Sequence, residues 1–347
     1  MHLPFAADRH HLRQRQDDVL ASVCFSRQPA DAGELPLHAS TAQVPMVSLA
    51  ADGAFGSALE IWCADGSITH GQREALRFWH NDEILFGLIQ LPEADFDSGS
   101  VLDVGKTPLQ RATEYAYREI FKLTDALGFG SILRFWNYFA DINGESHGSE
   151  RYRQFNVGRQ DGFLAGGRAL IGAVPAACAL GFEEGPLTVY FFAARGVTPL
   201  AIENPRQVSA YLYPADYGPR SPTFSRASVT HLGGKHLLFL SGTASIVGHQ
   251  TLHLGDVVAQ TRETVANIQA IVAEANRVVP QAAFSTADLC YKVYVRHAKD
   301  VGAIDAELRR SLGQSARLTY LNADICRHDL LMEIEATAGH PMENLPA

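Results

Sequence analysis

Two stretches of the chain repeat the same order of hydrophobic and polar positions. The first begins at Asp103 and the second at Gly255, and each opens with a short polar segment followed by apolar residues at helical spacing. Each then passes through a Gly- or Pro-containing connection into an alternating run, LRFWNYFADIN in the first and LCYKVYVRHAKD in the second. A helix followed by a strand, twice over, predicts an α+β chain of two similar units.

The boundary between the two units is predicted near Pro205, which interrupts the pattern. Further strands are expected before each helix, in SALEIWCADG and in KHLLFLSGTASI. We therefore predict an N-terminal extension over 1–40, a first unit over 41–203 and a second unit over 204–347, each with a sheet and with helices packed on one of its faces.

The run LLMEIEA near the C-terminus predicts a strand with an unusual face. Because side chains alternate along a strand, Glu333 and Glu335 share one face, and Met332 and Ile334 share the other. An isolated carboxylate is rarely buried without a partner. The face that carries the two glutamates is therefore expected to be in contact with water or to serve a function.

Composition narrows the classes of function. The chain has 347 residues, of which 46% are hydrophobic and 19% charged, and a formal net charge of −9, which is ordinary for a globular protein. With no basic excess to neutralise phosphates, a non-specific nucleic-acid binder is not expected. A few local arginines could still bind a small anion.

The cysteines and the N-terminal sequence indicate a reduced, cytoplasmic protein. There are five cysteines, an odd number, with no CxxC and no His partner at metal-ligand spacing. No run reaches the length of a membrane span, and the N-terminus lacks the apolar core of a signal peptide. We expect neither a metal nor a cofactor, and no membrane or nucleic-acid partner.

The last third of the chain resembles the Rid (YjgF-like) family, whose fold is also described as chorismate-mutase-like. The resemblance rests on Ser241, Gly242, Gly255, Asp256, Gln260, Thr261, Asn267, Ile268 and the MEIEA run. Rid proteins are small α+β subunits that form trimers with ligand sites between neighbours. The resemblance implies two tandem Rid-like units in this chain, and it leaves a monomer and a homo-oligomer both open.

A resemblance to the chorismatases covers nearly the whole chain. It rests on four blocks in order: RFWNYFADIN, ERYRQFNVGRQDGF, NPRQVSAYLYPADYGPRSPTFSRA and SGTASIVGH. Chorismatases convert chorismate to 3-hydroxybenzoate, to 4-hydroxybenzoate or to a dihydroxylated cyclohexadiene carboxylate, with release of pyruvate. The resemblance implies that the small-molecule substrate of this chain is chorismate.

Two catalytic residues follow from that resemblance. The family's acid corresponds to Glu333, and a carboxyl group whose pKa is raised in an apolar cleft suits protonation of the enolpyruvyl methylene of chorismate. Cys326 stands at the position that carries Cys in 3-hydroxybenzoate synthases and Ala in the hydrolases. Its sulfur could act as a nucleophile or polarise the ring, and Arg327 and His328 beside it could lower its pKa.

Substrate contacts are expected from four segments. In ERYRQFNVGRQDGF the resemblance implies Tyr152 and Arg159 as ligand contacts, and Arg151 and Arg153 are expected to be surface or ion-pair residues. Alternation along a strand would place these two arginines on one face and Tyr152 on the other, so all three could not enter one site. The other candidates are Tyr211 and Tyr213, at matched spacing for one face, the small-residue turn Gly242, Thr243 and Ala244, and Arg317, near where Rid proteins keep a carboxylate-binding arginine.

Other functions stay open at this stage. Ala244 stands where a dedicated 3-hydroxybenzoate synthase is expected to have Gly, so 4-hydroxybenzoate is a possible second product. Hydrolysis to the cyclohexadiene diol is the alternative reaction. A Rid-like module that binds a metabolite without turning it over would need no acid at Glu333. A Rid-type imine deaminase is disfavoured by the long first half of the chain.

Overall fold

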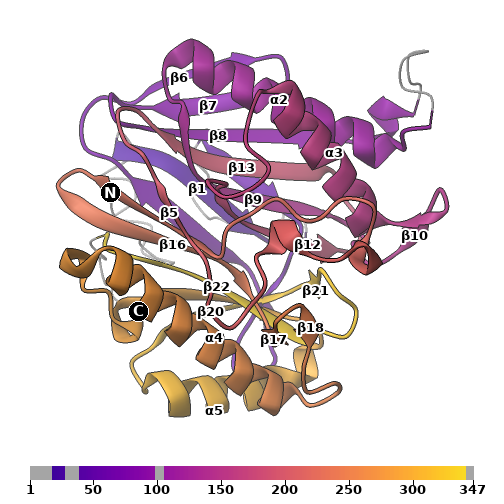
Figure 1. The fold of residues 1–347 in the computed structure, drawn as a ribbon, viewed down its shortest axis with the longest axis vertical. Coiled ribbons are helices and arrows are strands. Elements are labelled where there is room, and N and C mark those ends of the chain that lie inside the picture. Colours follow the sequence, from indigo (N-terminus) through magenta and orange to yellow (C-terminus); the bar gives the residue numbers. More distant parts are fainter. Residues whose placement is uncertain (1–17, 28–38, 98–104, 341–347) are drawn as a thin grey trace.

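Two large sheets lie face to face, and helices cover the outer face of each sheet (Figure 1). The computed structural model describes residues 18–27, 39–97 and 105–340. Helices α2 (Pro108–Leu127) and α3 (Arg151–Ala165) cover one sheet, and α4 (Val257–Val278) and α5 (Val301–Leu312) cover the other. The predicted α+β class, with mixed sheets and helices on one face of each, is confirmed.

The first sheet has seven strands. Their order is β21 (Asp324–Ile325), β12 (Ala176–Phe182), β9 (Ser131–Ala140), β13 (Leu187–Ala194), β8 (Ile84–Leu91), β7 (Leu76–His80) and β6 (Thr69–Arg73). Strands β9 and β12 pair in parallel, and the other neighbours are antiparallel. The edge strand β21 comes from the C-terminal part of the chain.

The second sheet has eight strands. Their order is β14 (Leu200–Ile202), β15 (Ala227–Leu232), β16 (Lys235–Thr243), β22 (Met332–Ala338), β19 (Cys290–Val295), β20 (Arg317–Asn322), β3 (Ser48–Leu49) and β4 (Phe55–Gly56). Its last two strands come from the N-terminal part of the chain, so each large sheet takes edge strands from the other half.

Smaller sheets complete the fold. The strands β2 (Thr41–Val44), β1 (Val19–Phe25) and β5 (Ala58–Cys63) form a three-stranded sheet, and two ribbons pair β10 (Glu145–Ser146) with β11 (Ser149–Glu150) and β17 (Ile246–Val247) with β18 (Gln250–Thr251). Within the predicted extension 1–40, residues 1–17 and 28–38 lie outside the described residues, and the division into domains stays a prediction.

The core between the sheets is rich in aromatic side chains. Trp136 and Tyr190 stack with ring centroids 4.9 Å apart on the seven-stranded sheet, and Phe239 and Tyr294 face them from the eight-stranded sheet. Trp62 of β5 packs into the same layer. Burial of these large rings holds the sheets together. No helix within the described part of the chain is long and apolar enough to cross a membrane.

The two predicted helices form as their sequences indicate. The side chain of Asp256 caps α4 by accepting a hydrogen bond from the backbone N–H of Ala259 at 2.9 Å. The apolar residues Ile268 and Ile271 are fully buried against the eight-stranded sheet. The capping box of Thr107 and Gln110 starts α2.

The block ERYRQFNVGRQDGF is a helix, α3, and not a strand, so the alternation argument for it was wrong. Its glycines explain how this helix packs: Gly158, Gly162 and Gly166 recur every four residues and therefore lie on one face. A Cβ atom at Gly162 would lie 2.6 Å from Cβ of Tyr117 on α2. The absence of side chains on this face lets α3 lie directly on α2.

We predict that Gly162→Leu lowers the free energy of unfolding by about 1–3 kcal/mol, because a new side chain would force α3 away from α2. Chemical denaturation measures the effect. Ala165→Leu on the exposed side of the same helix is the matched control and should change stability little. Equal effects of the two substitutions would contradict close packing at the glycine face.

Candidate active site

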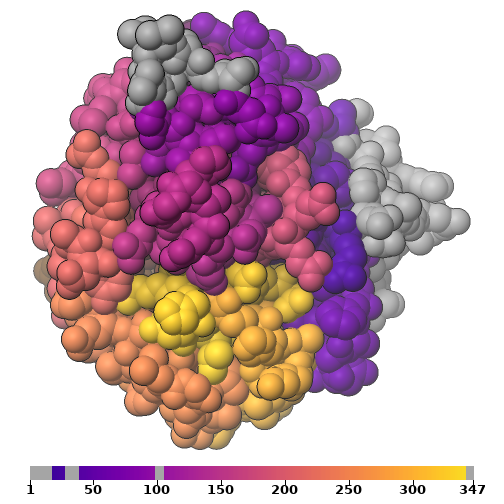
Figure 2. All heavy atoms as spheres, turned by 90° about the vertical axis from the view of Figure 1, so that its right-hand side faces the viewer, coloured from indigo at the N-terminus to yellow at the C-terminus, as the bar shows by residue number. Residues whose placement is uncertain are grey.

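A cavity of about 770 Å³ opens between the two halves of the chain. Its walls come from the β10–β11 ribbon, α3, β12, the segment 207–226, the end of β16, the segment 244–254 and the segment 326–333. Figure 2 shows, on one face of the molecule, C-terminal residues in yellow at the surface between the magenta first half and the orange second half. The cavity is therefore assembled from segments far apart in sequence.

Glu333 lies at the wall of this cavity and is only 4% exposed. Burial, together with the nearby carboxylate of Glu335, raises its pKa from 4.5 to about 8, against the opposing effects of Arg134 and Arg226. Gly242 on the neighbouring strand makes room for it, because a Cβ there would overlap the Glu333 carboxyl group. Glu333 is thus a buried acid that keeps its proton at neutral pH.

Glu335 is equally buried but has the opposite protonation behaviour. Its carboxylate accepts hydrogen bonds from Arg134 Nη2 at 2.7 Å and Trp136 Nε1 at 2.8 Å, both on β9 of the facing sheet. Lys292 Nζ on β19 lies 2.9 Å away and also pairs with Glu60 on β5 at 2.6 Å. These cations lower the pKa of Glu335 to about 2 despite its burial, so it is ionised.

Cys326 follows β21, and its thiol donates to Glu333 Oε2 at 3.9 Å. Burial and the nearby Glu333 raise the pKa of the thiol to about 12, so it is neutral. Arg327 lowers this pKa as expected, but desolvation outweighs its effect, so the net shift is upward and the expected lowering of the pKa does not result. The thiol of Cys326 is therefore neutral at this site.

Three guanidinium groups line the cavity with unused donors. Arg159 and Arg226 are 1% and 3% exposed. The Nε atoms of Arg159 and Arg226 and the Nη2 atom of Arg327 are buried without a hydrogen-bond partner. Within the described residues none of the three forms an ion pair with a carboxylate. Such groups are costly to bury alone, and their arrangement suits a ligand with more than one anionic group.

Aromatic rings hold two of these arginines in place. The guanidinium of Arg327 lies 4.1 Å from the ring centroid of Tyr217 and 5.2 Å from that of Tyr213. Arg226 donates to the hydroxyl of Tyr213 at 2.8 Å. The segment around these tyrosines forms 3₁₀ turns at Ala210–Leu212 and Ala215–Tyr217, and Pro214 lies between them. The strand alternation expected for Tyr211 and Tyr213 was therefore wrong.

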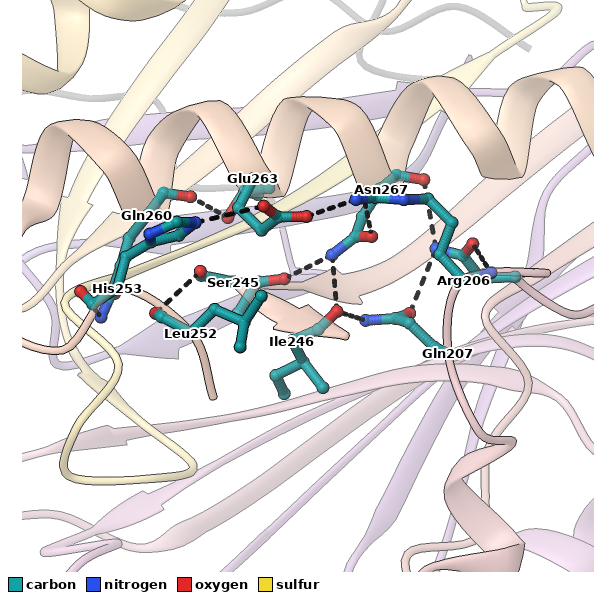
Figure 3. Close-up of polar contacts among 12 residues, drawn as sticks. Arg206, Gln207, Ser245, Ile246, Leu252, His253, Gln260, Glu263 and Asn267 are labelled. Atoms are coloured by element: carbon teal, nitrogen blue, oxygen red, sulfur yellow. Dashed lines mark hydrogen bonds and ion pairs between the residues drawn. The ribbon is translucent and has the colours of Figure 1, made fainter. Parts of the chain in front are cut away.

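Polar residues of α4 hold the cavity wall from outside (Figure 3). Asn267 donates to the carbonyl groups of Ala244 at 3.0 Å and Ile246 at 2.9 Å, and Gln207 donates to the same Ile246 carbonyl at 2.9 Å. Gln260 accepts from the backbone N–H of Leu331, two residues before Glu333. Gln260 and Asn267 of this helix therefore fix the backbone around the site.

The structure brings most of the predicted site residues to the cavity. Its lining includes Glu333, Cys326, Tyr152, Arg159, Tyr213, Gly242 and Ala244. Arg151 pairs with Glu93 and Arg153 with Glu150, as expected for ion-pair residues.

Three candidates do not line it. The side chain of Thr243 is buried and donates to the carbonyl of Ser241 at 2.9 Å. Tyr211 lies on the first 3₁₀ turn and is absent from the cavity wall. Arg317 is exposed at the start of β20, opposite Cys290 and away from Glu333.

Sequence reasoning did not single out Arg226 and Arg327 as ligand contacts. Arg226 is the last residue before β15, near the end of the block SPTFSRA, and Arg327 follows Cys326 directly. The one sequence feature that could have indicated such a contact is that Arg327 directly follows the candidate catalytic residue Cys326. No cluster of three or more metal-ligating side chains is present in the ranges that the structure describes.

The chain is similar over most of its length to known proteins. A family described as "Chorismatase FkbO/Hyg5-like, N-terminal" matches residues 60–193. A 3-hydroxybenzoate synthase of Streptomyces hygroscopicus is 37% identical over 286 residues, covering 80% of each chain, and a chorismatase of Streptomyces rapamycinicus is also 37% identical, covering 81% of this chain and 82% of its own.

A solved structure agrees with these sequence matches. A crystal structure of a chorismatase superposes with a TM-score of 0.81 at 30% identity, covering 97% of this chain and 98% of its own. The chain therefore belongs to the chorismatase family of enzymes. The resemblance identified from its sequence blocks is confirmed.

We predict that wild-type stability falls between pH 5 and pH 8 because of Glu333. Its pKa is 4.5 in the unfolded chain and about 8 in the folded protein, so folding binds a proton in this window and stability decreases as pH rises through it. Glu333→Gln lacks this titration. Its free energy of unfolding, measured relative to that of the wild type, should therefore increase by roughly 2–4 kcal/mol from pH 5 to pH 8. Urea denaturation at both pH values measures this; a constant difference would contradict a raised pKa.

Proposed function

We propose that the protein converts chorismate to 3-hydroxybenzoate and pyruvate, with 4-hydroxybenzoate as a second product. The observation that carries this proposal is the protonated carboxyl group of Glu333 at the wall of a cavity that also exposes three guanidinium groups without carboxylate partners. An acid and a dianion-binding wall in one cavity meet the two needs of this reaction.

Substrate binding uses the guanidinium groups. Chorismate carries one carboxylate on its ring and one on its enolpyruvyl group, and Arg159 on α3 lies on a different segment from Arg226 and Arg327. Arginine binds a carboxylate with a planar pair of N–H donors. The rings of Tyr213 and Tyr217 support Arg327 and add an apolar surface for the substrate ring.

The chemistry begins with transfer of a proton from Glu333 to the enolpyruvyl methylene, which becomes a methyl group. The resulting oxocarbenium ion is captured within the substrate, pyruvate leaves, and the ring loses a proton as it becomes aromatic. Hydroxybenzoate and pyruvate together contain the atoms of chorismate, so no water is consumed. The carboxylate formed at Glu333 can take back the ring proton, which restores the acid.

Cys326 favours this path over hydrolysis. As a neutral thiol in contact with Glu333, it occupies space beside the acid that a water molecule would need in order to capture the cation. The 3-hydroxybenzoate synthase among the relatives supports this choice of product. Ala244 at the cavity wall, where Gly is expected in a dedicated synthase, favours 4-hydroxybenzoate as the second product.

We predict that Glu333→Gln lowers the rate of pyruvate release from chorismate by at least about 100-fold, because general acid catalysis of this size is lost, while chorismate still binds. Wild-type kcat/KM should fall as pH rises through about 8, since the acid must be protonated. A coupled pyruvate assay and calorimetric binding measure both quantities.

The matched control is Glu145→Gln, which neutralises an exposed carboxylate of the same cavity and should keep the wild-type rate. Full activity of Glu333→Gln would contradict the acid role. Binding of chorismate without any pyruvate release by the wild type would instead indicate a metabolite-binding module.

A second prediction concerns the product. Cys326→Ala should raise the share of the cyclohexadiene diol at least several-fold, because the smaller side chain admits water beside Glu333. Chromatography with mass detection measures the product ratio. Cys24→Ala, which removes a buried thiol on β1, should leave the ratio unchanged. An unaltered ratio in Cys326→Ala would show that the thiol does not exclude water.

A further inference from the structure

Glu335 lies behind the cavity wall and not in it. It is two residues from Glu333 on the same face of β22, and it is absent from the cavity lining, as are its partners Arg134, Trp136 and Lys292. It therefore cannot contact a substrate bound in the cavity. Nevertheless three donors from two other strands fix both of its oxygen atoms.

Glu335 belongs to a buried cluster of four charged side chains whose net charge is zero. Arg134 and Lys292 are each positive, and Glu335 and Glu60 are each negative; all four are at most 5% exposed. A neutral Glu333 leaves this cluster balanced, whereas an ionised Glu333 would add a buried negative charge beside the Glu335 carboxylate. Repulsion between like charges is strong where water is excluded.

We propose that Glu335, fixed as a carboxylate by Arg134, Trp136 and Lys292, is the positioning residue that keeps the proton on Glu333. This inference rests on the proposed role of Glu333 as the acid. Glu335 touches neither substrate nor reacting atoms, and it acts only through its charge. Both pKa shifts have the direction that this proposal requires. Glu335 raises the pKa of Glu333, and the two cations lower the pKa of Glu335.

Other groups around Glu333 also contribute. Arg134 and Arg226 are cations that oppose its protonation, and a bound substrate carboxylate would neutralise the charge of Arg226. The titratable groups that face Glu333 from the elements packed against it are Cys178 on β12, Cys326 after β21, Tyr152 on α3 and Tyr294 opposite it on β19. Burial raises the pKa of each of these, so all stay neutral, and Glu335 is the nearby anion.

The test compares three variants of the full chain by their pH–rate profiles for pyruvate release. Glu335→Gln should move the alkaline limb to lower pH by about one unit or more and reduce the rate at pH 8 by about fivefold or more, with activity retained at low pH. Glu335→Asp keeps the charge and should keep the limb near its wild-type position. Glu60→Gln removes an equal charge from the far end of the same cluster and should move the limb much less.

A measurement that needs no turnover accompanies these profiles. The infrared carbonyl band of the protonated Glu333 carboxyl group is assigned by its absence in Glu333→Gln, and its loss with rising pH should occur at lower pH in Glu335→Gln than in wild type. If Glu335→Gln does not fold, the double variant Glu335→Gln with Lys292→Met removes one charge of each sign, and a smaller shift in the same direction is expected, because the lost cation partly offsets the lost anion.

The outcomes separate the two proposals. Identical titration of the band in wild type and Glu335→Gln, or equal shifts in Glu335→Gln and Glu60→Gln, would overturn the role of Glu335. Full pyruvate release by Glu333→Gln would overturn the acid role, while the band would still show whether Glu335 controls the proton on Glu333.

Discussion

The ion pair between Arg134 and Glu335 joins the two sheets at the centre of the molecule. It links β9 of one sheet to β22 of the other at 2.7 Å, with both side chains almost fully buried. Burying an ion pair is costly unless further contacts compensate for the lost water, and here Trp136 and Lys292 supply such contacts to Glu335, while Nη1 of Arg134 is buried without a hydrogen-bond partner. The pair links the two sheets directly beside Glu333, which lies two residues from Glu335 on the same face of β22.

A second electrostatic effect arises in the cavity, where buried guanidinium donors have no hydrogen-bond partner. Arg159, Arg226 and Arg327 keep buried donors that no protein group satisfies, which costs stability in the unliganded protein. A dianionic ligand would form hydrogen bonds with these donors. Binding would thereby remove the penalty for burying them, which contributes to the affinity for that ligand. Because Arg159 lies on α3 and the other two arginines lie on segments of the second half, the ligand would also bridge the two halves of the chain.

The sequence contained the local information but not the spatial arrangement. Helices α2 and α4 and the strands that follow them could be predicted from their periodicity, and Glu333 and Cys326 could be singled out because ordered sequence blocks resemble a known family. The burial of both faces of β22 could not, since it depends on Arg134 and Lys292, which are distant in sequence. Helix α3 was misread because its residues satisfy a strand pattern over a few positions, and the glycine spacing that fits α2 becomes meaningful only when the two helices pack. Arg317 was a candidate because Rid proteins have a carboxylate-binding arginine near this position. In the structure it lies on β20, which is separated from β22 by β19, and it does not line the cavity.

The exchange of edge strands has a consequence for biosynthesis. Strand β3 pairs with β20, so Ser48 and Leu49 must find partners at Leu321 and Tyr320, and β21 must find β12 in the opposite direction along the chain. Neither large sheet can complete its hydrogen-bonded ladder until nearly the whole polypeptide has left the ribosome. Pairings of such long sequence separation slow folding and leave strand edges exposed meanwhile, so nascent chains of this protein are expected to depend on chaperones until the C-terminal strand is in place.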